Sequence, residues 1–238
     1  MTMYKWEKDA IILLYTTEIH LGVLNLPKTN LKTYAYDIIK DNIIRCKLMP
    51  GEVINEQILT EELSISRTPI REALNRLEQE GYVEIMPKIG VVVKHITYKD
   101  VIEIFEVRQV LEPYSIARFG DKLESEKLLY YKSQIMNPSD PVKEEDYFLD
   151  TEMHRYFFHV CENKYFIDVL RHVLDQNNRV IIVSRGNGAR MHDSKKEHIA
   201  IIDKLLEGDL ENATELMKTH LKNCREASLE YYTKYYHI

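Results

Sequence analysis

The sequence predicts a mainly α-helical protein, in which an N-terminal winged helix-turn-helix is followed by an all-α antiparallel helical bundle. Three observations lead to this fold class. Glycine and proline are scarce, at 8 and 7 in 238 residues, which favours long helices over a turn-rich β fold. Residues 31–96 have the order helix, helix, turn, helix, hairpin. The segments after Thr97 all have the apolar spacing of helices.

The first three helices are indicated by apolar spacing and by capping residues. A helix begins at Leu31 and continues to about Lys47, after which "MPGE" turns the chain. Asn55 can cap a short second helix, and Ser66 can cap a third, which Gly81 ends. The short "SIS" link between the last two helices is typical of a helix-turn-helix.

A β-hairpin is expected directly after the third helix. "YVEIM" (82–86) and "VVVKHI" (91–96) are short runs rich in β-branched residues, and "PKIG" joins them. The hairpin completes a predicted winged helix-turn-helix domain over residues 31–96.

The sequence after the hairpin predicts a helical domain over residues 97–238. Residues 1–30, before the winged helix, are an N-terminal extension of unknown role. Thr97 with Asp100 resembles a capping box that opens a helix to about Phe119, and Ser194 with Glu197 resembles another. Further helices are expected at 122–136, 142–161, 164–185, 194–207 and 210–234, with loops at 136–141 and 185–193.

Composition excludes several classes of protein. The net charge of −6 neither requires nor forbids contact with nucleic acid, because a few basic residues on one face are enough. The three cysteines are far apart and form no C-x-x-C, which argues against a disulfide framework and fits a cytoplasmic location. The apolar run 10–26 contains Glu18 and His20, so we interpret it as an added helix and expect no membrane partner.

The third helix has the features of a DNA-reading helix. Its apolar side chains form one stripe, while Arg67, Arg71 and Asn75 follow each other at four-residue steps on another face, with Thr68 beside them. Arginine can bind guanine bidentately and asparagine can do so for adenine. In an isolated helix such a stripe is more often a solvated surface. The helix-turn-helix and hairpin context favours entry into the major groove.

Asp150 and His154 are the first two candidate metal ligands. They lie four residues apart in "LDTEMHRYFFH", which puts both side chains on one face of a helix. Two polar residues on a solvated face would give the same pattern. The pair therefore needs partners from another helix.

His198 and His220 supply those partners in a predicted helical hairpin. Gly208 separates two helices with a short link, so they should pack antiparallel. His198 lies about 15 Å before the turn and His220 about 18 Å after it, at similar heights on the two apolar faces. One carboxylate and three imidazoles can form a metal site in a bundle, suited to Zn²⁺, Ni²⁺, Mn²⁺ or Fe²⁺.

Residues 31–96 closely resemble the winged-helix domain of GntR-family bacterial transcription regulators. The stretches "LMPGEVINEQILTEELSISRTPIREALNRLEQEGYVEI" and "PKIGVVV" carry the resemblance, and "SRTPIREAL" is its specific core. It implies that Arg67, Thr68 and Arg71 contact DNA and that the wing around Lys88 and Gly90 touches the minor groove. Ile89 stands where a basic residue is common in the family.

Residues 97–235 resemble the FCD ligand-binding domain, the type found behind this winged helix. The family pattern D-x-x-x-H…N, with later histidines in EH-x-x-I and H-L, marks its metal-binding branch and falls here on Asp150, His154, Asn163, His198 and His220. Met153 stands where phenylalanine is common. The resemblance implies that the metal and Asn163 help to hold an organic-acid effector whose carboxylate meets Arg108. A structural pair of Arg108 with Glu112 is an equal alternative. Arg179, Arg185 and Arg190 are further candidates to complete the effector pocket, although a solvated face is the expected place of each.

These expectations combine into one functional hypothesis. The chain is expected to be a homodimeric regulator that binds an operator with two half-sites and senses a small carboxylate through a metal. Repression is expected because it is the usual mode of the family that the chain resembles. The chain is not expected to be an enzyme. Three alternatives stay open at this point: a regulator whose signal is the metal itself, a metalloenzyme that uses the Asp/His₃ set, and an acyl-CoA sensor, against which the four metal-ligand matches argue.

Overall fold

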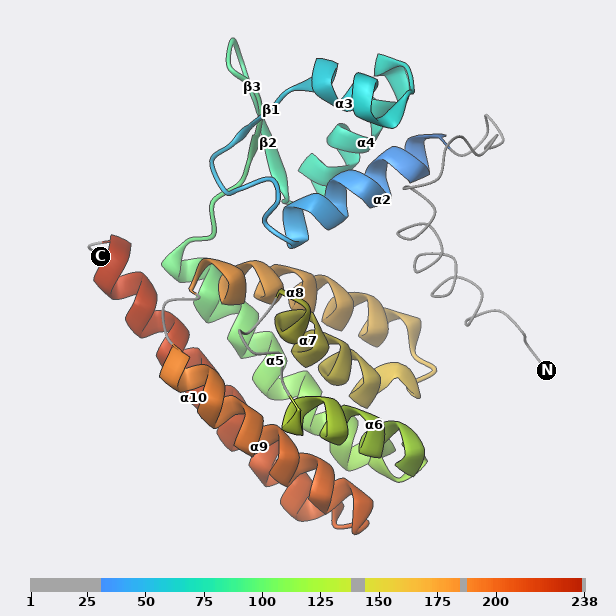
Figure 1. Cartoon of the computed structure of the whole chain (residues 1–238), viewed down its shortest axis with the longest axis vertical. Helices are drawn as coiled ribbons and strands as arrows, with labels where there is room; N and C mark the ends of the chain where they lie inside the picture. Colours follow the sequence, from blue (N-terminus) through green and yellow to red (C-terminus); the bar gives the residue numbers. More distant parts are fainter. Residues whose placement is uncertain (1–30, 138–143, 185–187, 237–238) are drawn as a thin grey trace, which may run out of the picture.

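The computed structural model describes residues 31–137, 144–184 and 188–236. The predicted N-terminal extension and the apolar run within it lie outside these ranges. The described residues form a winged-helix domain that sits on one side of a bundle of long helices (Figure 1). No helix in these ranges is both long and apolar enough to cross a membrane.

The N-terminal domain has the predicted order of helices and hairpin. Its elements are α2 (Leu31–Ile44), β1 (Val53–Ile54), α3 (Glu56–Leu63), α4 (Arg67–Gln79), β2 (Val83–Met86) and β3 (Gly90–Val93). The three strands are antiparallel in the order β1-β3-β2. Strand β1 was not predicted, because two residues are too few to give a periodic signal.

Local signals explain where α3 and α4 begin. The side chain of Asn55 accepts hydrogen bonds from the backbone amides of Gln57 and Ile58, as expected of an N-cap. Ser66 holds the N-cap position of α4 without a side-chain capping bond. The predicted apolar stripe of α4 is buried and packs on α2, with Ile70, Ala73, Leu74 and Leu77 in one core cluster. The opposite face of α4 is left exposed to solvent.

The C-terminal domain consists of helices joined by short links over its described residues. Its elements are α5 (Tyr98–Phe119), a short 3-10 turn (Gly120–Lys122), α6 (Ser125–Met136), α7 (Glu144–His159), α8 (Lys164–Val183), α9 (Gly188–Leu206) and α10 (Leu210–Tyr236). The capping box of Thr97 with Asp100 is confirmed. Helix α10 packs along both α5 and α9. Gly208 has a φ of +75°, a conformation that favours glycine, at the turn of the α9–α10 hairpin.

Helix α9 begins earlier than predicted. It starts at Gly188, so part of the expected loop 185–193 is helical and Ser194 is not a capping residue. The predicted capping box of Ser194 with Glu197 is therefore wrong. Alanine, arginine and methionine at 189–191 are strong helix formers, and they extend the helix backward through the region.

The two domains meet at helix α8, which lies along the side of the bundle that faces α2 (Figure 1). Buried Asp175 of α8 binds Lys40 Nζ of α2 at 2.9 Å and accepts a hydrogen bond from Tyr82 Oη at 3.2 Å. It also pairs with Arg155 of α7. Arg179, expected on a solvated face, is instead almost fully buried and donates to the backbone carbonyl of Lys94.

Candidate metal centre

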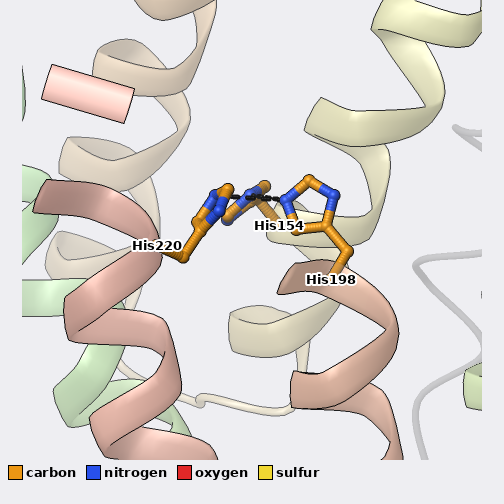
Figure 2. A group of neighbouring side chains, drawn as sticks. All are labelled: His154, His198 and His220. Carbon is orange, nitrogen blue, oxygen red and sulfur yellow. Dashed lines mark hydrogen bonds between the residues drawn. The ribbon is translucent and has the colours of Figure 1, made fainter. Parts of the chain in front are cut away.

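Three histidines from three helices converge inside the C-terminal bundle. His154 comes from α7, His198 from α9 and His220 from α10, and their rings point toward one another (Figure 2). Nε2 of His198 lies 3.3 Å from Nε2 of His154 and 3.1 Å from Nε2 of His220. None of the three side chains is more than 2% exposed. The predicted height match of His198 and His220 across the hairpin therefore brings these two residues into contact.

The spacing of the three nitrogens fits a common ligand set around one cation. Zn²⁺–N bonds of about 2.0–2.1 Å at tetrahedral angles place ligand nitrogens about 3.3 Å apart. The two measured Nε2 separations, 3.3 and 3.1 Å, lie close to that value. The three residues also form a group whose potential ligand atoms all lie within 4.8 Å of one another. Three imidazoles could thus hold a metal with little movement.

Each ring is held from behind by a carboxylate. His154 Nδ1 donates to Glu112 Oε2, and His220 Nδ1 donates to Glu197 Oε2 at 2.8 Å. His198 Nδ1 lies 3.2 Å from Asp150 Oδ1. A carboxylate on Nδ1 fixes the tautomer that leaves Nε2 free to bind a metal, which is a common outer arrangement of metal-binding histidines.

Asp150 is next to the histidines but not at their point of convergence. The structure places Asp150 Oδ1 3.2 Å from Nδ1 of His198, whereas the three rings approach one another through their Nε2 atoms. The sequence correctly predicted that Asp150 and His154 share one face of α7. Direct binding of a metal by Asp150 stays a prediction, and it would require this side chain to turn from His198 Nδ1 to the centre.

The charge of the site favours a divalent cation. Three carboxylates contact the rings and one guanidinium, that of Arg108, pairs with Glu112, which leaves two negative charges when the imidazoles are neutral. Burial alone would raise the pKa of Glu112, but Arg108 and His154 outweigh it and lower that pKa to about 2. Glu112 is therefore ionised at neutral pH. A buried centre of this charge requires protons or a cation.

In the absence of a metal, a proton supplies part of that charge. Burial alone would lower the pKa of His220. The contact with Cys224, the hydrogen bond to Glu197 and the charge of Asp150 raise it to about 10. Cys224 Sγ lies 3.6 Å from Nε2 of His220. A metal that binds Nε2 must displace this proton.

Arg108 and Asn163, the two predicted effector contacts, lie in different surroundings. Arg108 is buried, and its Nε donates to Glu112 Oε1 at 2.5 Å, so the structural pair is present. Asn163 is exposed at the N-terminus of α8, where its side chain accepts from the amides of Tyr165 and Phe166. The structure does not bring Asn163 into the histidine group. Contact of either residue with an effector stays a prediction.

The predicted DNA-contacting residues lie on one exposed surface of the N-terminal domain. Arg67, Thr68, Arg71 and Asn75 are all exposed on α4. Arg67 Nη2 donates to Gln57 Oε1 at 2.6 Å, and Arg71 Nε donates to Glu56 Oε2 at 2.8 Å. Exposed pairs of this kind are weak, so the arginines can exchange these partners for DNA.

The predicted wing is the exposed turn between β2 and β3. Lys88 and Gly90 have φ values of +69° and +114°, and Ile89 between them is exposed. The positive φ of Gly90 explains the glycine at this place. An apolar side chain therefore occupies the tip, with Lys88 beside it.

Glu112 and Glu197 were not identified as parts of the site from the sequence. The sequence indicates Glu112 only as a partner of Arg108, and Glu197 only as part of a capping box. A signal was present for Glu197, since it directly precedes His198 in "EHIAI". That neighbour suggests the wrong ring, however, because Glu197 binds His220 of the facing helix.

Comparison with known families gives two matches along the chain. Residues 31–93 match the family described as bacterial regulatory proteins, gntR family. Residues 103–223 match the FCD domain. The repressor GlaR of Escherichia coli (strain K12) is 26% identical over 201 residues, covering 79% of this chain and 90% of that protein.

Solved structures agree with these matches. A transcriptional regulator of the GntR type from Rhodococcus sp. RHA1 has a TM-score of 0.72 and 22% identity, covering 84% of this chain and 97% of that one, which shows the fold. The Zn²⁺-bound FCD domain of TM0439 has a TM-score of 0.50 and 27% identity, covering 60% of this chain and 99% of that domain.

Proposed function

Because this chain belongs to the GntR family of bacterial regulators and carries an FCD domain, it is a DNA-binding transcription regulator, and we propose that its helical domain binds a divalent metal and a small carboxylate effector that modulates operator binding. Proteins named as repressors are among its relatives. We expect repression that the effector releases. The family membership decides against the alternative of a metalloenzyme.

The convergence of three Nε2 atoms is the observation that supports a metal most directly. We propose His154, His198 and His220 as ligands, with Asp150 as the fourth. Nitrogen ligands at this spacing suit Zn²⁺, while Ni²⁺, Mn²⁺ and Fe²⁺ can use the same residues. The Zn²⁺-bound FCD domain of TM0439 supports zinc as the first ion to test.

The carboxylate effector is proposed to complete the coordination of this metal. With Asp150 as the fourth ligand, a shell of five or six positions leaves at least one that the protein does not fill. A buried arginine next to the site, Arg108, would attract an anion, and its fork can bind a carboxylate bidentately. Nε of Arg108 already donates a hydrogen bond to Glu112, so an effector would bind the remaining N–H groups of the guanidinium. The resemblance adds Asn163 as a further proposed contact.

Operator affinity measured with and without ligands tests this function. Native mass spectrometry of the purified chain would identify the retained metal and small molecule. Isothermal titration of operator DNA should then give different affinities for the metal-loaded protein with and without that carboxylate. An affinity that follows metal alone would favour the alternative of a metal-responsive regulator. An affinity that follows neither would contradict the proposed sensing role.

The domain junction supports a route from the centre to DNA. Arg155 directly follows the proposed ligand His154 on α7, and its side chain pairs with Asp175. Asp175 also binds Lys40 and Tyr82 of the N-terminal domain. A ligand that shifts α7 would thereby change contacts with the winged helix, provided that it binds one arrangement better than the other.

Arg71→Ala should weaken operator binding by about 1–3 kcal/mol, because the complex loses both hydrogen bonds of an arginine that binds a guanine bidentately. The lost pair with Glu56 is exposed and should change the free energy of unfolding little. A mobility-shift titration at fixed salt measures the operator affinity. Arg118→Ala, an exposed arginine on α5, is the matched control. Unchanged operator affinity in Arg71→Ala would remove Arg71 from the contact set.

We propose that exposed apolar residues of α5 and α8 form the contact between two copies. Val110 and Tyr114 of α5 and Tyr165 and Val169 of α8 are exposed, up to 71% for Tyr165. Tyr114 packs on Phe166 of α8, with ring centroids 5.8 Å apart, so the two helices share this surface. Contiguous exposed apolar side chains of this kind are typical of protein contacts. A two-fold dimer would match an operator with two half-sites.

Tyr165→Glu should therefore shift the chain toward the monomer, because it places a charge in the proposed contact. Sedimentation velocity over a dilution series measures this shift. Leu129→Glu on α6 introduces the same charge at another exposed apolar position and should leave the dimer intact. Equal sedimentation of both variants and the wild type would place the contact elsewhere.

A further inference from the structure

Two of the carboxylates behind the histidines are themselves held in place. Glu197 uses Oε2 for Nδ1 of His220 and accepts a hydrogen bond from Asn223 Nδ2 on Oε1, at 2.7 Å. Glu112 uses Oε2 for Nδ1 of His154 and accepts from Arg108 Nε on Oε1. In each case both oxygens have a defined donor. The direction of each carboxylate, and hence of each ring, is therefore fixed.

We propose that Glu112 and Glu197 are positioning residues of the metal centre, which set its affinity without binding the ion. The proposal rests on the proposed metal site. Each glutamate keeps its imidazole in the tautomer with hydrogen on Nδ1, so that the lone pair of Nε2 faces the centre. Each glutamate also makes Nε2 a stronger metal ligand, because the carboxylate stabilises the positive charge that the ring acquires when Nε2 binds a cation.

The positions of the two residues support positioning rather than direct binding. Glu112 and Glu197 contact Nδ1, which lies on the opposite edge of the ring from the converging Nε2 atoms. Glu197 lies on α9 and contacts His220 on α10. Glu112 lies on α5 and contacts His154 on α7. The two contacts therefore join four helices around the centre. Metal affinity should depend on this packing as well as on the ligands.

Glu197→Gln is the main test, because the amide has the same shape but no charge. We expect the affinity for Zn²⁺, measured by competition with a chromophoric chelator, to fall about 10–100-fold. Glu112→Gln should act in the same direction. Its unfolding must be followed in parallel, because the change leaves buried Arg108 without its carboxylate. If that variant does not fold, Glu197→Gln decides, since Glu197 has the equivalent geometry.

A control and a second readout separate positioning from general damage. Glu215→Gln changes an exposed glutamate on α10 and should keep the wild-type zinc affinity. Nitrogen-15 spectra of the histidine rings should show a strong hydrogen bond from Nδ1 of His220 to the carboxylate in the zinc-loaded wild type, and a weaker one in Glu197→Gln. Wild-type zinc affinity in a folded Glu197→Gln would overturn the proposal. Absence of zinc binding in the wild type itself would instead overturn the metal site on which it rests.

Discussion

His220→Ala should nearly abolish metal binding by the helical domain. A four-ligand zinc site is worth about 10–16 kcal/mol, so one ligand carries roughly 3 kcal/mol, or more than a hundredfold in affinity. The loss should exceed that share, because His220 is in contact with His198 and its removal frees the ring that it faces. Inductively coupled plasma mass spectrometry of the purified variant, and chelator competition, measure the result.

The pH dependence of metal uptake gives this prediction a second readout. The folded-state pKa of His220 is raised from its usual 6.5 to about 10, so in the metal-free protein the ring of His220 carries both of its protons at pH 7–8. Zinc should therefore release at least one proton per ion, which an indicator dye in weak buffer detects. Apparent affinity should rise with pH up to about 10. In His220→Ala this released proton should be absent.

The same pKa fixes the sign of a stability effect. A group whose pKa is raised on folding stabilises the fold fully below its unfolded pKa of 6.5 and loses that effect as pH rises through about 10. The metal-free protein should therefore become less stable between these values. Bound metal replaces the proton, so the metal-loaded protein should lose less stability over the same range.

His159→Ala is the matched control for both readouts. His159 lies on α7 with His154, but its Nδ1 donates to the backbone carbonyl of Tyr156 at 2.7 Å. Five residues of helix turn it away from the face of His154. Full zinc retention in His220→Ala together with His198→Ala would exclude the proposed site.

The sequence predicts which helices carry the proposed metal ligands, but not the carboxylates that contact Nδ1 of the histidines. The distances of His198 and His220 from Gly208 predict that the two residues pair, because a tight helical hairpin fixes the relative height of its two helices. Asp150 and His154 were placed on one face by their spacing alone. Such arguments use one helix or one hairpin, and neither requires the rotation of distant helices.

Contacts across separate helices could not be predicted in this way. Glu112 reaches His154 from α5, and Glu197 reaches the ring of α10 from α9. Which side chains meet depends on how each helix is rotated about its axis in the packed bundle, and that rotation is set by all its neighbours. The same limit applies to Asp150, which shares the face of His154 but contacts Nδ1 of His198. The misassigned start of α9 has a different cause, since local helix propensity outweighed a plausible cap.

Asp175→Asn should lower the free energy of unfolding by about 3 kcal/mol, near the lower end of the range for breaking a buried ion pair. Asp175 is 3% exposed and binds both Lys40 and Arg155, so the neutral amide leaves two cations without their shared anion. Lys40 and Arg155 are themselves part-exposed, which moderates the cost. Urea denaturation measures it. Asp203→Asn, which breaks the more exposed pair with Lys132 inside the helical domain, should cost no more than about 1 kcal/mol.

The larger consequence should appear in regulation. Asp175 is bound at once by α7, which carries His154, and by the winged-helix domain through Lys40 and Tyr82. If this junction transmits the state of the centre, Asp175→Asn should bind zinc normally and bind operator DNA, while the effect of metal and carboxylate on operator affinity disappears. A ligand can shift the winged helices only by its difference in affinity for the two arrangements, and the variant removes the contact that links them. Ligand-dependent operator binding of wild-type size in Asp175→Asn would show that the signal crosses elsewhere, for instance where Phe148 of α7 lies under Arg45 of the N-terminal domain.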